Sequence, residues 1–320
     1  MAVYTHVDLD ALKAFLEPYG LSDVMSYRGI EEGVENTNYF VEAATADGPL
    51  PFIVTILEKR VSRDDIPFFL GAMAHMNAAG LPTPEPLRTK AGETLSSIAG
   101  KPAIVISFLE GRPRLLPGPA DCEALGALLA RMHRAGAAFA QTRKNDLSIE
   151  GWKGLADACA SSKAEAPPGV QDLIARELPR LASDWPTSLP KGLVHADLFP
   201  DNVFFNPSGA PSGVIDFYFS CTDFFAYDLA VTLNAWASPS DAADAGAWRQ
   251  DNSDALLAGY ETVRPLQIAE KNALPALLRG AAMRFLLTRL YDWLHRAPNA
   301  VVKVKDPLEY ARLLEFHAGR

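Results

Sequence analysis

The sequence predicts an α+β fold with two lobes, a small β-rich N-terminal lobe and a larger helical C-terminal lobe. Short strand-like runs fill the first third of the chain, and long amphipathic patterns dominate after Gly111. We place residues 1–110 in the first lobe and residues 111–320 in the second. A length of 320 residues with a hydrophobic fraction of 48% is enough for a sizeable core.

In the first lobe, we expect Asp8 to cap a helix whose apolar side is formed by Leu9, Leu12, Phe15 and Leu16. Strand-like runs follow at residues 24–30, 37–44 and 52–57, and the turn signal of residues 46–49 comes after the second run. A further helix is expected to begin at Asp64 or Asp65 and to end before Gly80. Two more strands are expected near residues 94–98 and 103–108.

In the second lobe, the clearest helical pattern runs from residue 121 to about residue 138, with Leu125, Leu128, Leu129 and Met132 on its apolar side. A weaker helical pattern covers residues 170–181, and several helices are expected between residue 226 and the C-terminus. Short strands are expected at residues 193–194, 203–205 and 214–215. A β-rich segment thus lies between helical ones.

Composition excludes several classes of partner. The net charge is −9 and no block of Lys or Arg occurs, so we expect no nucleic-acid partner. No apolar run approaches the roughly 18 residues of a membrane span, so we expect no membrane partner. The three cysteines have no paired spacing and the N-terminus does not resemble a signal peptide, which predicts a cytoplasmic protein. The sequence leaves the oligomeric state open.

The segment from His195 to Asn202 has the pattern H-x-D-x-x-x-x-N, which is close to the catalytic loop of kinases. In this interpretation Asp197 orients and deprotonates the acceptor hydroxyl, and Asn202 binds magnesium. Asp216 follows Asn202 by fourteen residues, at the end of an apolar strand, where a second magnesium ligand is expected. The glycine of the D-F-G motif is replaced by Tyr218. The alternative, that these are ordinary turn residues, weakens once Asp216 is included.

Residues 223–230 then lead into a helix that contains Asn234 and Trp236. With these motifs the chain resembles the aminoglycoside-phosphotransferase and choline-kinase-like superfamily. The resemblance implies a protein-kinase-like fold and an ATP- and magnesium-dependent phosphotransferase. The longer strings of residues 33–40, 195–205 and 215–234 are similar to those of bacterial homoserine kinases, which implies homoserine as acceptor and a step of threonine biosynthesis.

The resemblance also implies nucleotide-binding residues. Asn36 and Asn38 would lie over the ATP phosphates, although both are equally plausible as hairpin-turn residues. Residues 108–110 (Phe108, Leu109 and Glu110) would present backbone groups to adenine, unless they form a plain exit from the strand. Asp228 would accept backbone hydrogens of the catalytic loop, or act only as an acidic residue at a helix start. We expect His195 to support the same loop.

One position departs from the superfamily. A lysine that pairs with the α- and β-phosphates is expected on the third strand, but the equivalent position is Thr55. Lys59 or Lys101 is a candidate substitute for it. Asp64 or Asp65 is the nearest candidate for the acidic partner of that lysine. This departure concerns the phosphate contacts and leaves the catalytic residues unchanged.

A zwitterionic acceptor needs a cation for its carboxylate and an acidic or aromatic group for its ammonium. Arg284 and Arg289 are candidates for the cation, and about 140° separates them on a helix; the alternative is pairing with nearby acids. Candidates for the ammonium contact are Asp223, Tyr218 and Trp236, with core packing as the alternative for the aromatic ones. His133 and His75 are expected to be structural.

Two other functions remain open from the sequence. The same fold phosphorylates other acceptors, so a kinase of another small amino alcohol or of an aminoglycoside is the first alternative. A nucleotide-binding regulator without catalysis is the second, because the strand lysine is missing at Thr55.

Overall fold

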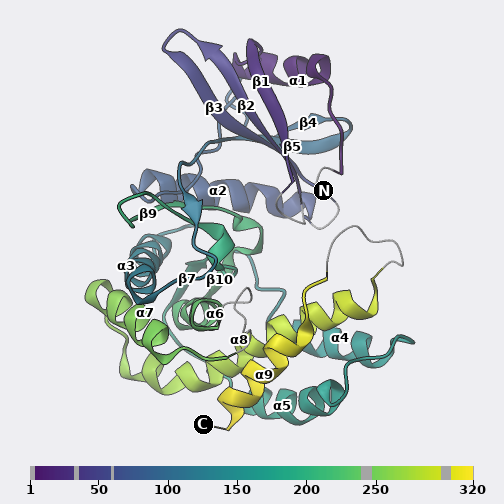
Figure 1. The fold of residues 1–320 in the computed structure, drawn as a ribbon, viewed down its shortest axis with the longest axis vertical. Coiled ribbons are helices and arrows are strands. Elements are labelled where there is room, and N and C mark those ends of the chain that lie inside the picture. The colour runs from purple at the N-terminus through teal and green to yellow at the C-terminus, as the bar shows by residue number, and fades with distance from the viewer. Residues whose placement is uncertain (1–3, 32–35, 59–60, 239–246, 297–303, 320) are drawn as a thin grey trace. The chain divides into compact units, whose positions relative to one another are not determined.

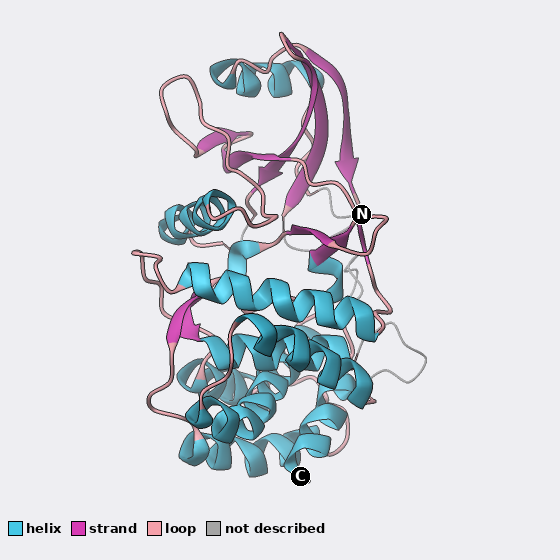
Figure 2. Cartoon of the chain, turned by 90° about the vertical axis from the view of Figure 1, so that its left-hand side faces the viewer, coloured by secondary structure: helices cyan, strands magenta, loops and turns pink. Residues whose placement is uncertain are grey.

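The computed structural model describes residues 4–31, 36–58, 61–238, 247–296 and 304–319. The chain divides into two compact units, Met1–Glu110 and Gly111–Arg320. The N-terminal unit is built on an antiparallel sheet, and helices make up most of the C-terminal unit (Figures 1 and 2).

The sheet of the N-terminal unit has five strands in the order β1-β2-β3-β5-β4, and every pairing is antiparallel. The strands are β1 (Val24–Ile30), β2 (Thr37–Thr45), β3 (Gly48–Ile56), β4 (Ser96–Ile98) and β5 (Lys101–Ser107). The tight turn between β2 and β3 places Gly48 at φ 111°, a conformation that favours glycine. The Thr45 hydroxyl donates to the Gly48 carbonyl oxygen at 2.7 Å and closes the turn.

Helix α1 (Leu9–Leu16) shares the core on one face of this sheet. Its start follows the expectation, because the Asp8 carboxylate accepts from the Ala11 N–H at 2.8 Å. The apolar side of α1 packs in one cluster with alternate strand residues, among them Val41, Phe52 and Val54. Side chains alternate along a strand, so Asn38 and Thr55 lie on the opposite face. Helix α2 (Ile66–Ala78) ends before Gly80, whose φ is 76°.

The C-terminal unit contains two small sheets, with strand orders β6-β8-β9 and β10-β7. Their strands are β6 (Arg112–Pro113), β7 (Lys191–Val194), β8 (Val203–Phe205), β9 (Pro211–Val214) and β10 (Cys221–Phe224). The helices of the unit are α3 (Pro119–Gly136), α4 (Ile149–Ala160), α5 (Val170–Asp184), α6 (Phe225–Ala237), α7 (Gln250–Val263), α8 (Ile268–Leu294) and α9 (Pro307–Ala318).

Helix α6 is the centre of this unit, since all thirteen of its residues are buried. Helices α3 and α7 pack closely because each has a glycine at the contact. A Cβ at Gly126 would lie 2.1 Å from the Leu256 carbonyl oxygen, and one at Gly259 would lie 2.0 Å from that of Glu123. Larger side chains at either position would force the helices apart, and polar residues of both helices are part of the site described below.

The expected elements are largely confirmed. The helices predicted from Asp8, from residue 121 and from residue 170 are present, and the five predicted strands of the first third form one sheet. The sequence interpretation did not foresee α4, β6 and β10, which are short or only weakly patterned. Among the described residues, no helix is both long enough and apolar enough to cross a membrane.

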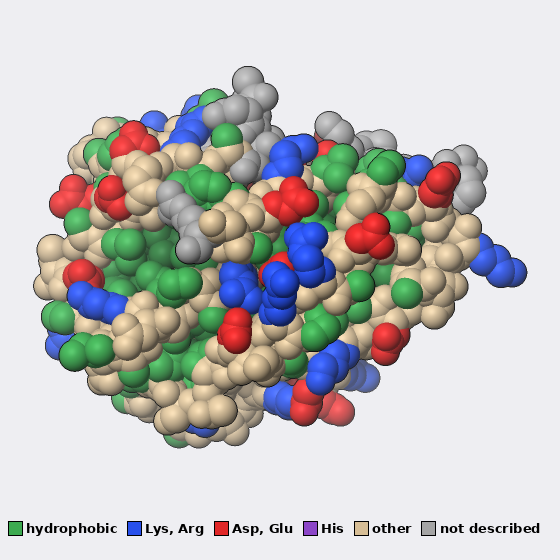
Figure 3. All heavy atoms as spheres, turned by 90° about the horizontal axis from the view of Figure 1, so that it is seen from below, with side chains coloured by type: hydrophobic (Ala, Val, Ile, Leu, Met, Phe, Trp, Pro, Cys, Tyr) green, Lys and Arg blue, Asp and Glu red, His purple; other side chains and the backbone are tan. Residues whose placement is uncertain are grey.

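Charged side chains of both signs are mixed on the surface. On the face drawn in Figure 3, Lys and Arg side chains lie beside Asp and Glu side chains. On this face, several Lys and Arg side chains gather near the middle, with Asp and Glu side chains around them.

Candidate active site

The loop between β7 and β8 carries Asp197 and Asn202. Asn202 ends a short 3₁₀ turn, and its side-chain amide donates to the Asp197 carbonyl oxygen at 2.8 Å and to the Asp197 Oδ2 at 3.4 Å. The amide N–H groups of Asn202 thus face Asp197, and the Asn202 Oδ1 is the type of oxygen that could accept a cation. Ala196, directly before Asp197, has a φ of 63°, a strained conformation for a residue other than glycine.

Asp216 directly follows Ile215, and both backbone polar groups of Ile215 are bonded to the catalytic loop. The Ile215 N–H donates to the Asn202 carbonyl oxygen at 3.0 Å, and the Ile215 carbonyl oxygen lies 2.9 Å from His195 Nε2. Asp216 itself has a φ of 65°. The segment of Asp216 is therefore tied to the catalytic loop by one backbone hydrogen bond from Ile215 to Asn202 and by one contact with the His195 imidazole.

His195 joins the loop to Ile215 as a neutral imidazole. Its Nδ1 accepts from the Asp197 N–H at 3.2 Å, so Nε2 carries the proton that is donated to Ile215. Burial lowers the pKa of His195 and outweighs the nearby Asp228 carboxylate, which keeps the ring uncharged. The expected supporting place of His195 agrees with this geometry.

Asp228, in the first turn of α6, holds the start of the catalytic loop. Its carboxylate accepts from the His195 N–H at 3.0 Å and from the Ala196 N–H at 2.6 Å. Burial alone would raise its pKa, but the hydrogen bond from His133 and the Ala196 N–H outweigh burial and hold the pKa of Asp228 below its usual range. The Asp228 carboxylate is thus bonded to two successive backbone N–H groups of the catalytic loop.

A chain of buried polar groups continues from Asp228 to α8. His133 Nε2 lies 3.0 Å from Asp228 Oδ2, and His133 Nδ1 lies 2.7 Å from the Tyr260 hydroxyl. Arg264 donates to the same hydroxyl at 3.0 Å and to the fully buried Glu270 at 2.8 Å. Burial lowers the pKa of His133, so a neutral ring donates to Asp228 and accepts from Tyr260. The expectation of a structural His133 agrees with these contacts.

The two candidate arginines are both engaged by the protein. Arg284 is 1% exposed; it donates to the Ala196 carbonyl oxygen and lies 3.9 Å from Asp197 Oδ1, with its guanidinium 4.5 Å from the Phe285 ring centroid. Arg289 is 6% exposed, with Nη1 2.5 Å from the Glu309 carboxylate and 3.2 Å from the Asp306 carbonyl oxygen. Arg284 thus supports the catalytic loop, and Arg289 fixes the start of α9.

The aromatic and acidic candidates for the ammonium contact have different surroundings. Trp236 is fully buried, and its indole N–H donates to the Leu198 carbonyl oxygen at 2.9 Å. Its side chain therefore packs inside the unit and supports the catalytic loop, and it is not exposed to a ligand. Asp223 accepts from the Asn145 side-chain amide at 2.7 Å and from the Phe224 N–H at 2.7 Å. Burial raises the pKa of Asp223. Tyr218 is half-buried in the turn that follows Asp216.

In the N-terminal unit, Thr55 and Asn38 are cross-strand partners. The Thr55 hydroxyl donates to Asn38 Oδ1 at 2.7 Å, which leaves the Asn38 amide as a donor on this face of the sheet. Asn36 instead ties the ends of β2 and β3 together, because its Oδ1 accepts from the Glu58 N–H at 3.1 Å. Residues 108–110 follow β5 directly, and Phe108 packs edge-on against Phe40 with ring centroids 5.3 Å apart.

Lys101, one candidate for the missing strand lysine, has an acidic partner that was not expected. It pairs with Glu58, and it donates to the Thr5 hydroxyl at 2.8 Å. Burial would raise the pKa of Glu58, but the donors on Lys101, Thr5 and Thr37 outweigh it and lower the pKa. The acidic partner of Lys101 is therefore Glu58, and not the expected Asp64 or Asp65. Lys59, the other candidate, lies outside the described residues.

Several site residues were not found from the sequence. Glu58, Tyr260, Arg264 and Glu270 belong to no recognisable motif, and only the tertiary structure brings them to their partners. Glu270 is a fully buried acid at the start of α8, but Lys271 and Asn272 follow it directly, so the local sequence does not mark it as buried.

The donor set fits a magnesium ion shared with phosphates better than a metal held by protein alone. No group of three His, Cys, Asp or Glu side chains that could hold a metal occurs among the described residues. One carboxylate and one amide oxygen, from Asp216 and Asn202, are the type of partial ligand set that Mg²⁺ completes with phosphate oxygens and water. Together with the buried support of Asp197, the arrangement is suited to phosphoryl transfer.

Comparison with known proteins supports this chemistry. Residues 26–266 match the model of the phosphotransferase enzyme family. Homoserine kinase of Xanthobacter autotrophicus is 50% identical over 317 residues, covering 99% of this chain and 96% of that protein. Homoserine kinase of Rhizobium johnstonii is 49% identical over the same shares.

Solved structures show the same fold at low identity. Choline kinase from Cryptosporidium parvum has a TM-score of 0.69 at 13% identity, covering 98% of this chain and 95% of that chain. Spectinomycin phosphotransferase in complex with ADP and spectinomycin has a TM-score of 0.68 at 14% identity over the same shares. The fold of the chain is therefore that of kinases with small-molecule acceptors.

Proposed function

The chain belongs to the phosphotransferase enzyme family, and from this premise we propose that it is a homoserine kinase that transfers the γ-phosphoryl group of ATP to the hydroxyl of L-homoserine. The observation that carries this proposal is identity near one half along the full length of proteins named homoserine kinase. The reaction forms O-phospho-L-homoserine, a step toward threonine.

Asp197 acts as the base in this proposal. Phosphoryl transfer requires positioned reactants and a carboxylate that accepts the proton of the attacking hydroxyl. Asp197 is the carboxylate that the structure holds in the loop, through Asn202 on one side and Arg284 on the other. Because Asp228 and His195 fix the loop backbone, the carboxylate is positioned before substrates bind.

Asn202 and Asp216 would hold magnesium. The ion would neutralise charge on the β- and γ-phosphates during transfer. Asn202 directs its amide N–H groups to Asp197, which turns its oxygen to the other side, and the Ile215 bonds place Asp216 beside the same loop. In this proposal the two side chains supply part of the ligand set, and phosphate oxygens and water complete it.

We assign nucleotide contacts in the N-terminal unit to the sheet face opposite α1. Asn38 and Thr55 supply neutral donors for phosphate oxygens, and the backbone of residues 108–110 is proposed to meet adenine. Lys101, paired with Glu58, resembles the Lys–Glu ion pair of kinases and is the proposed substitute for the strand lysine. Its position on β5 alternates in step with Ala103 and Val105, which pack with α1, so it belongs to the other face of the sheet from Asn38 and Thr55. The three cysteines are unpaired thiols, in keeping with a cytoplasmic enzyme.

The decisive experiment measures ADP release with ATP, magnesium and a panel of acceptors: homoserine, choline, 3-aminopropanol, an aminoglycoside and a sugar. We expect turnover with homoserine at least about tenfold above every other acceptor. Preference for another acceptor would reassign the substrate within the family. ATP binding without turnover on any acceptor would instead favour a non-catalytic regulator.

A further inference from the structure

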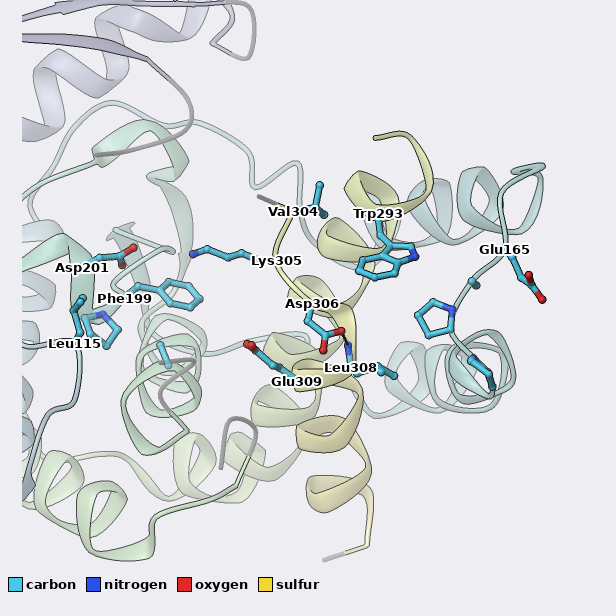
Figure 4. A pocket seen from close by; sticks show the side chains of 15 residues that line it. Leu115, Glu165, Phe199, Asp201, Trp293, Val304, Lys305, Asp306, Leu308 and Glu309 are labelled. Atoms are coloured by element: carbon cyan, nitrogen blue, oxygen red, sulfur yellow. Dashed lines mark hydrogen bonds between the residues drawn. The ribbon is translucent and has the colours of Figure 1, made fainter. Parts of the chain in front are cut away.

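A cavity of about 960 Å³ opens in the C-terminal unit beside the catalytic loop. Its wall includes Phe199, Pro200 and Asp201, the residues that follow Asp197 by two to four positions. The opposite wall comes from the start of α9, the end of α8 and the segment before α5, all within this unit (Figure 4). The cavity is therefore lined by residues of the C-terminal unit alone and includes the segment that directly follows Asp197.

Acidic side chains outnumber basic ones around this cavity. Four acidic side chains line it, and Lys305 is the one basic side chain among its described lining residues. The acids are Glu165, Asp201, Asp306 and Glu309. An acceptor that carries both an ammonium and a carboxylate finds several anionic partners here for the first group and a single cationic partner for the second.

Lys305 is placed to receive an anion. Its ammonium lies 5.3 Å from the centroid of the Phe199 ring, and it points toward Phe199 and Asp201 in Figure 4. It forms no ion pair with an acidic side chain of the described residues. A lysine that is held over an aromatic ring and is not neutralised by a neighbour retains its charge for a ligand.

The neighbouring acids are already oriented by other groups. Asp306 caps α9 by accepting from the Leu308 N–H at 2.9 Å, and Glu309 binds Arg289 at 2.5 Å. The buried arginines expected from the sequence to bind the carboxylate, Arg284 and Arg289, are also engaged by protein groups. The carboxylate of the acceptor therefore needs a different cation.

We propose that this cavity binds the amino-acid end of the acceptor, with the Lys305 ammonium on the α-carboxylate and the carboxylates of Asp306 and Glu309, at the start of α9, facing the α-ammonium. This inference rests on the proposed function and names the residue that decides acceptor specificity. The cavity is larger than one amino acid, so its size does not exclude larger acceptors. Selection depends on charge, and Lys305 distinguishes an amino acid from the corresponding amino alcohol.

The test uses a matched pair of acceptors, homoserine and 3-aminopropanol, which is homoserine without its carboxylate. The full-length enzyme is compared with Lys305→Met, Lys305→Arg and the control Lys153→Met, an exposed lysine on α4. For Lys305→Met we expect kcat/KM for homoserine to fall by about 10- to 100-fold, mostly through KM, because one charge-assisted contact is lost. The kcat/KM for 3-aminopropanol and the KM for ATP should stay within about twofold.

Lys305→Arg should retain most of the homoserine preference, and Lys153→Met should behave as the unchanged enzyme. If the unchanged enzyme prefers homoserine and Lys305→Met keeps that preference, the assignment of Lys305 is wrong while the proposed function stands. If the unchanged enzyme shows no preference for homoserine, the proposed function itself fails. Equal losses with both acceptors would show that Lys305 acts on structure, and would also overturn the assignment.

Discussion

His133 on α3 and Asp228 on α6 form a fully buried pair, with Nε2 and Oδ2 3.0 Å apart. Asp228 in turn accepts from the backbone N–H groups of His195 and Ala196. The backbone of the catalytic loop therefore depends on an imidazole that lies outside the loop, on α3. Tyr260 and Arg264 extend this support to Glu270 on α8.

Replacing His133 should impair both stability and turnover. His133→Phe keeps a ring against Phe225 but removes one donor from the buried Asp228 carboxylate. We expect a loss of about 3 kcal/mol in the free energy of unfolding, the usual range for breaking a buried pair. The kcat should fall at least about tenfold as the loop shifts. Urea unfolding and steady-state kinetics measure both; the exposed His295→Phe is the control, and an unchanged kcat would contradict the support role.

The buried histidines predict a pH dependence of stability. Burial lowers the pKa of His133 and of His195, so below their unfolded value of about 6.5 the unfolded state binds more protons than the folded state. Stability should therefore fall as pH drops below about 6.5, by up to about 1.4 kcal/mol per pH unit for each histidine. Thermal unfolding between pH 7.5 and 5.5 tests this. A midpoint that rises on acidification would be incompatible with neutral buried rings.

Removing the proposed base should affect chemistry much more than nucleotide binding. Asp197→Asn preserves the shape of the side chain but cannot accept the proton, so kcat should fall by about 10²- to 10⁴-fold. The dissociation constant of ATP, measured by calorimetry, should change by less than about threefold. Asp157→Asn on α4 is a control of the same chemistry. Equal losses in turnover and ATP affinity would remove Asp197 from the role of base.

Replacing Arg284 tests whether this residue supports the catalytic loop or binds the acceptor. Arg284→Met removes the donor to the Ala196 carbonyl oxygen and the cation beside Asp197. We expect kcat to fall at least about 100-fold with little change in the KM for homoserine. Arg279→Met, on the same helix, is the matched control. A rise in the KM for homoserine with an unchanged kcat would instead show that Arg284 binds the carboxylate of the acceptor.

A negative charge at Asn38 should weaken ATP binding. Asn38→Asp keeps the oxygen that accepts from Thr55, so the sheet should remain stable. The new carboxylate would repel the phosphates, and we expect the KM for ATP to rise at least about tenfold while the unfolding midpoint stays nearly constant. Asn206→Asp, in the turn between β8 and β9, is the control. An unchanged KM for ATP would place the phosphates away from this face.

The sequence by itself determined most of the helices and strands and the class of reaction. Local periodicity, turn residues and the Asp8 cap predict most of the helices and strands, because these depend on neighbours in the chain. The loop from His195 to Asn202, with Asp216 behind the next strand, predicts a phosphotransferase because its short spacing fixes which side chains meet.

Only the tertiary structure decided which side chains are available to a substrate. The helical pattern around Arg284 and Arg289 is compatible with either a clamp or a buried support, and their partners come from residues 88 positions before Arg284 and 20 positions after Arg289. Distant parts of the chain also form the contact of Glu58 with Lys101 and that of Tyr260 with His133. The cavity beside Lys305 is likewise lined by distant segments. Such contacts join distant parts of the chain, so no local pattern encodes them, and they become visible only once packing has fixed every neighbour.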